Sequence, residues 1–309
     1  MKKSVAPTLK RDLVGHIGHV NAVRFTKDGN YCMTCSDDRT LKLWNPHKDE
    51  LEKKGQALTI KTYAGVHGYA IHDVVISSDN NKFISAGGDK ASILWDVSTG
   101  RVIRKFYGHT QRINCVSTNE EHTVLLSGSY DKTVRIYDLK SNLRDPIQIL
   151  NDCTDSVTSI QRTNYEILVS SVDGFLRIYD LRAGMLSCDS FHEPITSLSL
   201  THDQKCVLSA TLGGTIRLTE ISTGRLLQHY HGHRNDSYKI ETCVTNDDAR
   251  VIGTSEDGHV LMWDLVEASV LHNTVAHTRS ISSISYHPSL SCYVTASFDN
   301  TAKYWIDLT

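Results

Sequence analysis

The first residues in the sequence that could do chemistry are Cys32 and Cys35, a CxxC pair in the stretch NYCMTCSDDRTLKLW. This spacing is typical of a redox dithiol or of half a zinc site. The same cysteines could instead lie on one strand, where residues three apart point to opposite faces. The elements around the pair decide between these interpretations.

Histidines form a second pattern, in the pairs Gly15-His16, Val66-His67, Gly108-His109, Gly232-His233 and Ala276-His277. Ser or Thr and then Asp follow most of them, which are the residue types of a hydrolase triad. A triad needs one exposed nucleophile, however, whereas a grouping that recurs along the chain indicates a structural role in every unit. HExxH, P-loop and nucleophile-elbow patterns are missing from the sequence. We therefore predict a non-enzyme without catalytic residues.

Composition narrows the class of protein. The 309 residues include 33 basic and 35 acidic side chains, so the net charge of −2 gives no general attraction to nucleic acid. The N-terminus lacks the apolar segment of a signal peptide, and no apolar run approaches the roughly 18 residues of a membrane span. We expect a cytoplasmic or nuclear location, no membrane contact, and free thiols for the eight cysteines.

Internal repetition shows which elements must position these residues. The stretch SDDRTLKLWN (36–45) recurs as GGDKASILWD (87–96), SYDKTVRIYD (129–138), SVDGFLRIYD (171–180), TLGGTIRLTE (211–220), SEDGHVLMWD (255–264) and SFDNTAKYWI (297–306). A period of about 40–45 residues that ends in Trp-Asp predicts propeller blades of four short strands each.

These repeats resemble the WD-repeat propeller family, over the whole chain and in all seven copies. The resemblance implies an all-β, seven-bladed propeller, with residues 1–309 as a single domain. Too few residues follow Trp305 for a last strand, whereas TLKRDLV (8–14) has no blade of its own. We predict that this N-terminal strand joins the last blade and closes the ring. The wide spacing after the first repeat predicts a charged surface loop over about 46–60, within PHKDELEKKGQALTIKTY (46–63).

In that family the histidine, a strand Ser or Thr, the turn Asp and the Trp form a hydrogen-bonded network inside each blade. The resemblance implies the sets His16, Thr34, Asp38 and Trp44; His67, Ser85, Asp89 and Trp95; His277, Thr295, Asp299 and Trp305; and, with Tyr in place of Trp, His109, Ser127, Asp131 and Tyr137. Blade four has Cys153 at the histidine position, and blade five has Gly213 at the Asp position. One hypothesis is that neighbours hold these blades in place; a sharper one is that blades four and five are the mobile part of the ring.

Propellers of this family bind partners around the mouth of the central channel. The resemblance places the contacts just before the turn Asp and just before the innermost strand. The predicted protein-binding residues are Tyr69, Arg112, Tyr130, Tyr238, Lys239, Glu256 and Phe298. Their aromatic and Arg types are enriched at interface hot spots, and their mixed charge suits a protein better than a phosphate backbone.

Basic residues also recur at one strand position, as Lys42, Arg135, Arg177, Arg217 and Lys303. A ring of charge for nucleic acid is conceivable, but we expect the stems to lie along the blades with their heads in solvent, and no direct nucleic-acid contact. Separately, Tyr179-Asp180-Leu181-Arg182 resembles the box of WD-repeat substrate receptors for cullin-4 ubiquitin ligases. That resemblance makes Asp180 and Arg182 possible contacts for a ligase adaptor.

Several stretches, among them GGDKASILWDVSTGRVIRKFYGH (87–109) and EILVSSVDGFLRIYDLRAG (166–184), resemble one subgroup, the mitogen-activated protein kinase organizer scaffolds. The resemblance implies a non-catalytic adaptor whose partners are proteins, either kinase-pathway components or splicing factors, and a monomeric propeller within larger complexes. The alternative function is that of a substrate receptor in a cullin-4-type ligase. An enzyme acting in the channel is a third, less favoured possibility.

With the repeats in register, the CxxC pair has counterparts in every blade. A large apolar residue occupies the Cys32 position elsewhere, and mostly a small residue occupies the Cys35 position. Cysteine is acceptable at both as a small apolar side chain. We predict that the pair lies on the second strand of blade one, with no metal, disulfide or cofactor.

Overall fold

A computed structural model of the chain describes residues 6–51 and 53–307, and these residues form 28 β-strands and no helix. No helix in these ranges is therefore long and apolar enough to cross a membrane. The strands of the first three blades are β2 (Val20–Phe25), β3 (Cys32–Ser36), β4 (Leu41–Glu50), β5 (Lys53–Tyr63), β6 (Ile71–Ile76), β7 (Lys82–Gly87), β8 (Ser92–Asp96), β9 (Val102–Phe106), β10 (Ile113–Thr118), β11 (Val124–Ser129), β12 (Val134–Asp138) and β13 (Gln148–Leu150).

The remaining blades continue the same order. Blades four, five and six contain β14 (Val157–Arg162), β15 (Glu166–Ser171), β16 (Phe175–Asp180), β17 (Met185–Ser190), β18 (Ile195–Leu200), β19 (Cys206–Thr211), β20 (Thr215–Glu220), β21 (Leu226–His231), β22 (Thr242–Val244), β23 (Arg250–Thr254), β24 (His259–Asp264) and β25 (Val270–Val275). Blade seven contains β26 (Ile281–Tyr286), β27 (Cys292–Ser297), β28 (Thr301–Ile306) and β1 (Thr8–Val14).

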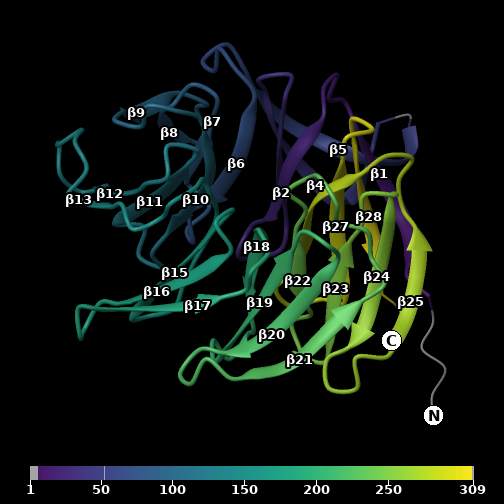
Figure 1. The fold of residues 1–309 in the computed structure, drawn as a ribbon. Coiled ribbons are helices and arrows are strands. Elements are labelled where there is room, and N and C mark those ends of the chain that lie inside the picture. The colour runs from purple at the N-terminus through teal and green to yellow at the C-terminus, as the bar shows by residue number, and fades with distance from the viewer. Residues whose placement is uncertain (1–5, 52, 308–309) are drawn as a thin grey trace.

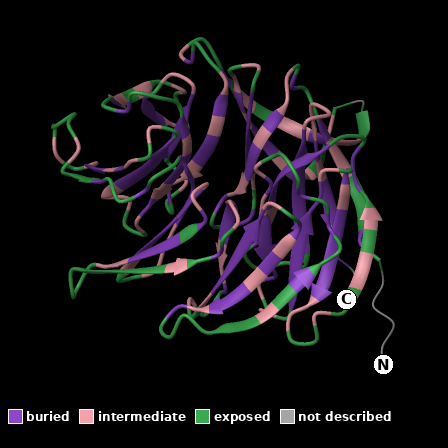
Figure 2. Cartoon of the chain, in the orientation of Figure 1, coloured by how far each residue is buried: buried purple, intermediate pink, exposed green. Residues whose placement is uncertain are grey.

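The predicted seven-bladed, all-β propeller is confirmed. Within each blade the strands are antiparallel neighbours, in chain order in blades one to six and with β1 as the outer strand in blade seven. The innermost strands β2, β6, β10, β18 and β22 face the centre of the ring (Figure 1). The turns and the outer strands β17, β21 and β25 are largely exposed or intermediate, whereas the inner strands are largely buried (Figure 2).

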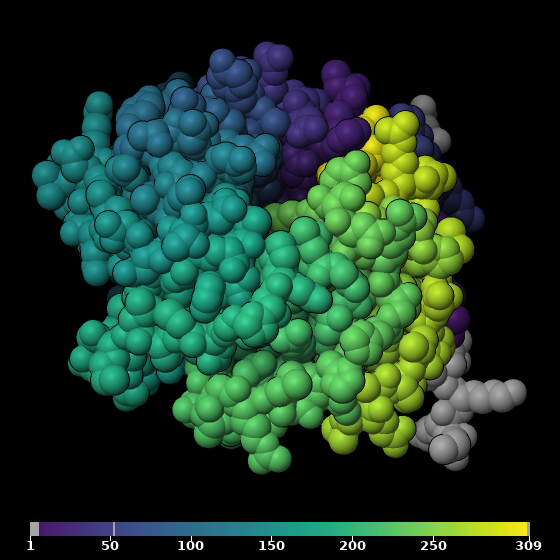
Figure 3. Space-filling view, viewed as in Figure 1, coloured from purple at the N-terminus to yellow at the C-terminus, as the bar shows by residue number. Residues whose placement is uncertain are grey.

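The N-terminal strand closes the ring, as the sequence predicts. Strand β1 pairs antiparallel with β28, from Thr8 opposite Ile306 to Val14 opposite Thr301. The C-terminal strands consequently lie beside the N-terminal blade (Figure 3). Closure leaves no sheet edge at the junction of the two chain ends, which protects that junction against pairing with other chains.

The predicted loop over 46–60 is wrong, because most of this segment is strand. Strands β4 and β5 continue as a hairpin with Asp49 opposite Ala57 and Glu50 opposite Lys53. Charged side chains stabilise the extension: Arg11 pairs with Asp49 at 2.6 Å, and Glu50 accepts a hydrogen bond from the Thr59 backbone. Polar composition suggested a loop, but edge strands of a propeller also face solvent and tolerate such residues.

The hairpin also reaches the neighbouring blade. Gln56 of β5 forms a single parallel bridge with Asp12 of β1, so blades one and seven share one eight-stranded sheet. Strand β1 therefore lies between β28 and the extended hairpin. The insertion therefore adds a second strand contact, between β5 and β1, beside the pairing of β1 with β28 that closes the ring.

The apolar core lies between blades rather than within them. Each cluster of buried apolar residues joins two adjacent blades, so every sheet packs against a neighbour on both faces. Cys32 belongs to the core between blades one and seven, and Cys35 to the core between blades one and two. The two thiols are free and point to opposite faces of β3, and burial raises the pKa of each. In this position they act as small apolar side chains.

The turn between the second and third strands has the same backbone in every blade. The residue after the turn Asp position has positive φ in all seven copies, from 59° at Lys90 to 84° at Gly258. In blades one, three, four, six and seven the Asp carboxylate accepts a hydrogen bond from the backbone two residues later, as Asp38 does from Thr40. This side-chain bond helps a non-glycine residue to tolerate the left-handed conformation.

Candidate functional site

The repeated His, Ser or Thr, Asp and Trp residues come together inside the blades. In blade one, His16 Nδ1 lies 2.8 Å from Asp38 Oδ2, and His16 Nε2 lies 2.7 Å from Thr34 Oγ1. The indole of Trp44 donates to the same hydroxyl at 2.9 Å. A neutral histidine satisfies every partner: the indole donates to the hydroxyl, the hydroxyl donates to Nε2, and Nδ1–H donates to the carboxylate.

Blades two and seven repeat this geometry with His67, Ser85, Asp89 and Trp95, and with His277, Thr295, Asp299 and Trp305. Blade three contains His109, Ser127 and Asp131 in the same arrangement, but the Tyr137 hydroxyl donates to the Tyr107 carbonyl instead. Burial alone would raise the pKa of Asp38, Asp131 and Asp299, but hydrogen bonds from the histidine and a neighbouring Thr hold each well below its ordinary value.

The order of contacts in these networks is that of a catalytic triad, with a hydroxyl, an imidazole and a carboxylate in line. The hydroxyl residues Thr34, Ser85, Ser127 and Thr295 are all fully buried. A nucleophile must reach its substrate, so these hydroxyls cannot act as one. The networks instead fix the packing of each blade by giving buried polar groups their hydrogen bonds.

Blade four replaces the missing histidine with an arginine. The Arg177 guanidinium makes two hydrogen bonds to Asp173, at 3.1 and 2.8 Å, and both side chains are about 6% exposed. The expectation that the strand cations extend into solvent is therefore wrong at Arg177. Blade four lacks a histidine donor at Cys153, and the nearest long cation turns inward to neutralise the turn carboxylate.

Blades five and six have less complete networks. In blade five Glu193 accepts from Thr211 at 2.7 Å beside Gly213, whereas Ser209 Oγ has no partner among the described residues. In blade six both ring nitrogens of the buried His233 are unpartnered within the same part of the chain. Burial and the charge of His231 lower the pKa of His233 to about 4.

Gly253 explains why the ring of His233 in blade six has no Ser or Thr hydroxyl as a hydrogen-bond partner among the described residues. It occupies the Ser or Thr position of the network, and a side chain there would lie 2.7 Å from the Trp263 ring. Trp263 fills that space and donates to the His231 carbonyl at 3.1 Å instead. His233 consequently loses the hydroxyl that the other histidines contact.

At the end of the ring where these turns lie, the central channel opens into a mouth with a cavity of about 340 Å³. Four of the predicted contact residues line this mouth: Arg112, Tyr238, Lys239 and Phe298. Tyr130 adjoins them, because its ring carries the Arg112 guanidinium 4.9 Å above its centre. Tyr130 and Tyr238 are each 50% exposed.

An aromatic cluster forms one wall of the mouth. Phe298 contacts the ring of Tyr238 edge-to-face at 5.3 Å and stacks on His19 at 4.9 Å. The three residues come from blades six, seven and one. The predicted contact types therefore converge across blades, although His19 was absent from the predicted set.

The other two predicted contacts lie elsewhere. Tyr69 is 66% exposed and packs its Cβ beside Gly88, and it does not line the mouth. Glu256 has a structural role: its Oε1 accepts hydrogen bonds from the backbone N–H groups of Asp236, Ser237 and Tyr238. Glu256 therefore positions the loop that presents Tyr238 and Lys239.

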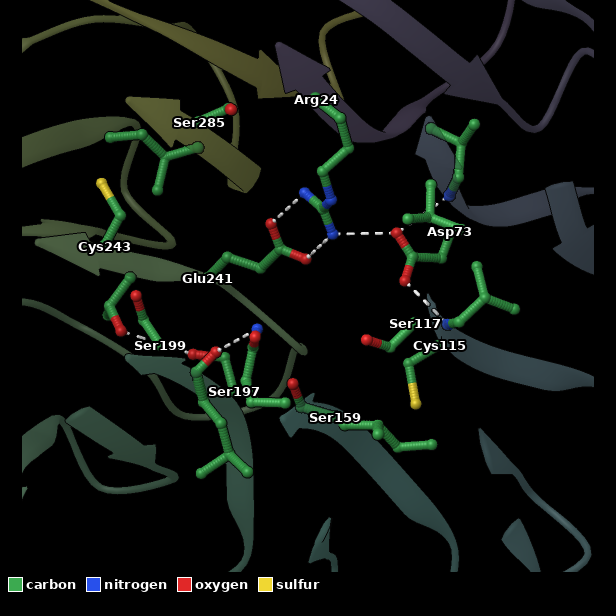
Figure 4. A pocket seen from close by; sticks show the side chains of 18 of the residues that line it. Arg24, Asp73, Cys115, Ser117, Ser159, Ser197, Ser199, Glu241, Cys243 and Ser285 are labelled. Carbon is green, nitrogen blue, oxygen red and sulfur yellow. Dashed lines mark hydrogen bonds and ion pairs between the residues drawn. The ribbon is translucent and has the colours of Figure 1, made fainter. Parts of the chain in front are cut away.

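Below the mouth, a polar cavity of about 410 Å³ runs through the ring between the innermost strands. Figure 4 shows Arg24 of β2 reaching across it to Glu241 and Asp73. The guanidinium donates to both carboxylate oxygens of Glu241 at 2.7 Å and to Asp73 at 2.8 Å. Burial alone would raise the pKa of Glu241, but Arg24 holds it below its ordinary value.

This charged cluster was not predicted from the sequence. Arg24 and Asp73 lie within innermost strands and Glu241 lies just before one, at positions where the other blades have no Asp, Glu, Lys or Arg. The alignment of the repeats contained that signal, because alternate residues of an innermost strand must face the channel. Counted in the register of the repeats, the predicted contact positions ended at the residue before each innermost strand, so they did not include Arg24, Asp73 or Glu241.

At the opposite end of blade four, Asp180 is the last residue of β16, and Arg182 lies in the turn between β16 and β17. Asp180 accepts hydrogen bonds from the backbone of Arg182 and Ala183. The Arg182 side chain is 66% exposed, and its guanidinium stacks 4.2 Å above the Tyr165 ring. This geometry presents the arginine head to solvent in a fixed orientation.

The described residues offer no metal centre, since no three His, Cys, Asp or Glu side chains in 6–51 and 53–307 gather as ligands would. The site is therefore best described as a polar channel with an aromatic and cationic mouth. A closed ring of seven four-stranded blades with this surface defines a propeller of the interaction-module class.

The family model for the WD domain, G-beta repeat, matches residues 7–45, 100–138, 224–264 and 268–305. Each matched segment runs from an outer strand to the third strand of the following blade. The chain belongs to the WD-repeat family. Members of this family generally mediate protein–protein interactions and are generally not catalytic.

Individual relatives match nearly the whole chain. WD repeat domain-containing protein 83 of Xenopus tropicalis is 46% identical over 299 residues, which is 96% of this chain and 92% of that protein. The Homo sapiens protein of the same name is 45% identical over 279 residues, covering 90% and 86%. The Dictyostelium discoideum homolog is 33% identical over 322 residues, covering 95% and 96%.

Proposed function

We propose that this propeller is a non-catalytic scaffold that gathers protein partners at the mouth of its channel. The observation that carries this proposal is the cluster of Tyr130, Arg112, Tyr238, Phe298 and Lys239 around one opening. Half-exposed aromatics beside an arginine are the composition of an interface hot spot. Folding the blades does not require large aromatics at these turns.

The resemblance to the mitogen-activated protein kinase organizer scaffolds supports two classes of partner, kinase-pathway components and pre-mRNA splicing factors. The relatives are named only for their repeats, so partner identity is part of the proposal. We further propose a monomeric propeller in the cytoplasm or nucleus that contacts proteins rather than nucleic acid. The mixed charge of the mouth supports this choice, because Asp37 and Glu241 line the same cavity as Arg112 and Lys239, which is therefore not a purely cationic surface.

Affinity purification of the tagged full chain, followed by mass spectrometry, tests the proposal. The variant Tyr130→Ala/Tyr238→Ala removes two half-exposed rings and should lose at least half of the specific partners. The matched control is Leu143→Ala/Leu290→Ala, which removes two exposed apolar side chains, 63% and 51% exposed, at the opposite end of the blades. Equal partner recovery with both variants would contradict the proposal.

A second candidate function is that of substrate receptor in a cullin-4-type ubiquitin ligase. The exposed guanidinium of Arg182, held between Asp180 and Tyr165, favours it. The purification described above discriminates between the two functions when Arg182→Ala is included. Loss of a cullin-4 adaptor in this variant alone supports the receptor, whereas kinases or splicing factors recovered with and without Arg182 support the scaffold.

A further inference from the structure

The carboxylates at the mouth already have partners. Asp37 accepts a hydrogen bond from Asn21 at 2.8 Å on one oxygen, and its other oxygen lies 3.5 Å from His19 Nδ1. Glu241 has both oxygens bound by Arg24. Both acids therefore already have polar or cationic partners within the protein.

The two cations of the mouth, Arg112 and Lys239, differ from the acids in their partners. Among the residues that the structure describes, neither Arg112 nor Lys239 forms an ion pair with a carboxylate. The Arg112 guanidinium lies over the Tyr130 ring, 4.9 Å from its centre, a cation–π contact that uses none of its N–H groups. Lys239 donates one hydrogen bond from Nζ to the Asn114 carbonyl at 3.0 Å, and its ammonium has three donors.

The charges of both cations lower the pKa of His72. His72 lines the same cavity as Arg112 and Lys239. Burial and the charges of Arg112 and Lys239 together lower the pKa of His72 to about 4, against a smaller opposite effect of Asp37. At His72 the two cations therefore outweigh the acid, even though the mouth as a whole contains both signs of charge.

We propose that the mouth binds a carboxylate side chain, from an acidic segment of a protein partner, between Arg112 and Lys239. The inference rests on the proposed interaction function and specifies the chemistry of the partner. Stacking on Tyr130 orients Arg112 for two parallel bonds to one carboxylate, and Lys239 supplies a third donor. The wall formed by Tyr238 and Phe298 packs against the neighbouring residues of the segment.

The size of the cavity favours an extended peptide. A space of about 340 Å³ accepts one or two side chains but no folded element such as a helix. The cross-channel bond from Lys239 to Asn114 holds the ammonium in place before a ligand arrives. Such preorganisation reduces the entropy lost on binding.

Fluorescence anisotropy of the purified full chain against three labelled peptide libraries tests this inference. The libraries are degenerate decapeptides that differ only at the two central positions, which hold Glu, Gln or phosphoserine. We expect the Glu library to bind about tenfold more tightly than the Gln library, because each charge-assisted hydrogen bond contributes about that factor or more. Arg112→Gln should remove the preference, and Arg101→Gln, an exposed arginine at the other end of a blade, should retain it.

Equal affinity for the Glu and Gln libraries overturns the inference, as does a preference that survives Arg112→Gln/Lys239→Gln. Tighter binding of phosphoserine than Glu by more than tenfold overturns the assignment to a carboxylate. Circular dichroism melting curves verify that each variant is folded. If Arg112→Gln keeps the partners that Tyr130→Ala/Tyr238→Ala loses, the interaction function stands and the carboxylate site fails.

Discussion

The guanidinium of Arg24 in blade one is bound by both carboxylate oxygens of Glu241 in blade six, at 2.7 Å each. Blade seven lies between these two blades, so the pair spans the channel rather than an interface between neighbours. Ser283 of blade seven donates to Glu241 at 2.6 Å, and Asp73 of blade two accepts from Arg24. One cation therefore ties four blades together through the centre of the ring.

We predict that Arg24→Met destabilises the protein by about 3 kcal/mol, because it leaves two buried carboxylates without their counter-charge. Chemical denaturation followed by tryptophan fluorescence measures the loss. The double variant Arg24→Met/Glu241→Met should recover at least half of it, since one unpaired charge is removed as well. A single-variant loss below about 1 kcal/mol would show that solvent in the channel already screens the cluster.

The histidines of blades six and seven allow a direct comparison. His277 has partners on both ring nitrogens, whereas His233 has none within the described residues. Replacing a hydrogen-bonded histidine leaves its Asp and Thr unpartnered, so His277→Leu should cost about 2 kcal/mol or more. His233→Leu removes only an orphaned polar ring and should be neutral or stabilising by about 1 kcal/mol. Thermal denaturation of both variants checks the contrast, and equal losses would refute it.

The general architecture could be predicted from the sequence because repetition multiplies weak signals. One strand pattern is ambiguous, but seven copies in register determine the blade count, and the surplus strand Thr8–Val14 indicates how the ring closes. The hydrogen-bonding sets followed from the same register. Their positions in the repeat were sufficient to bring His16 and Asp38 together.

Two of the missed features depend on contacts between repeats, whereas the pairing of Arg177 with Asp173 lies within blade four. The sequence contained a signal for that pairing, because Cys153 leaves the turn Asp without a histidine donor. The hairpin of β4 and β5 was missed because its polar composition is that of a loop, and because its contact with β1 of blade seven lies between two blades. The channel cluster involves three blades at once, and no single repeat contains the pattern.

Acid should weaken blade four through Asp173. Burial alone would raise the pKa of this carboxyl, but Arg177 and the backbone N–H groups of Thr154 and Phe175 lower it to about 2. A carboxyl with a depressed folded-state pKa stabilises the fold above its unfolded value near 4, and this contribution is lost as the pH falls toward 2. The contribution is at most about 2 kcal/mol.

The variant Asp173→Asn measures that contribution. Its stability should fall below that of the native sequence at pH 7, and the difference between the two should shrink between pH 4 and pH 2. Asp145→Asn is the control, because the exposed Asp145 has no side-chain hydrogen bond or ion pair with any residue that the structure describes. A difference that stays constant down to pH 2 would mean that Asp173 does not act through its charge.

Hydrogen exchange should locate the weakest part of the ring in blade five. Blade four has lost its histidine but retains a buried Arg177–Asp173 pair, whereas blade five has Gly213 in place of the turn Asp and Thr219 in place of the Trp. Exchange of buried amides reports the free energy of local opening, which depends on such polar and packing contacts.

We expect β19 and β20 to exchange at least tenfold faster than β7 and β8, whose network is complete. Mass spectrometry at peptide resolution measures the rates, with blade one as an internal reference. Equal protection in all seven blades would show that packing between neighbours alone holds blade five, and that the mobile-blade hypothesis is wrong.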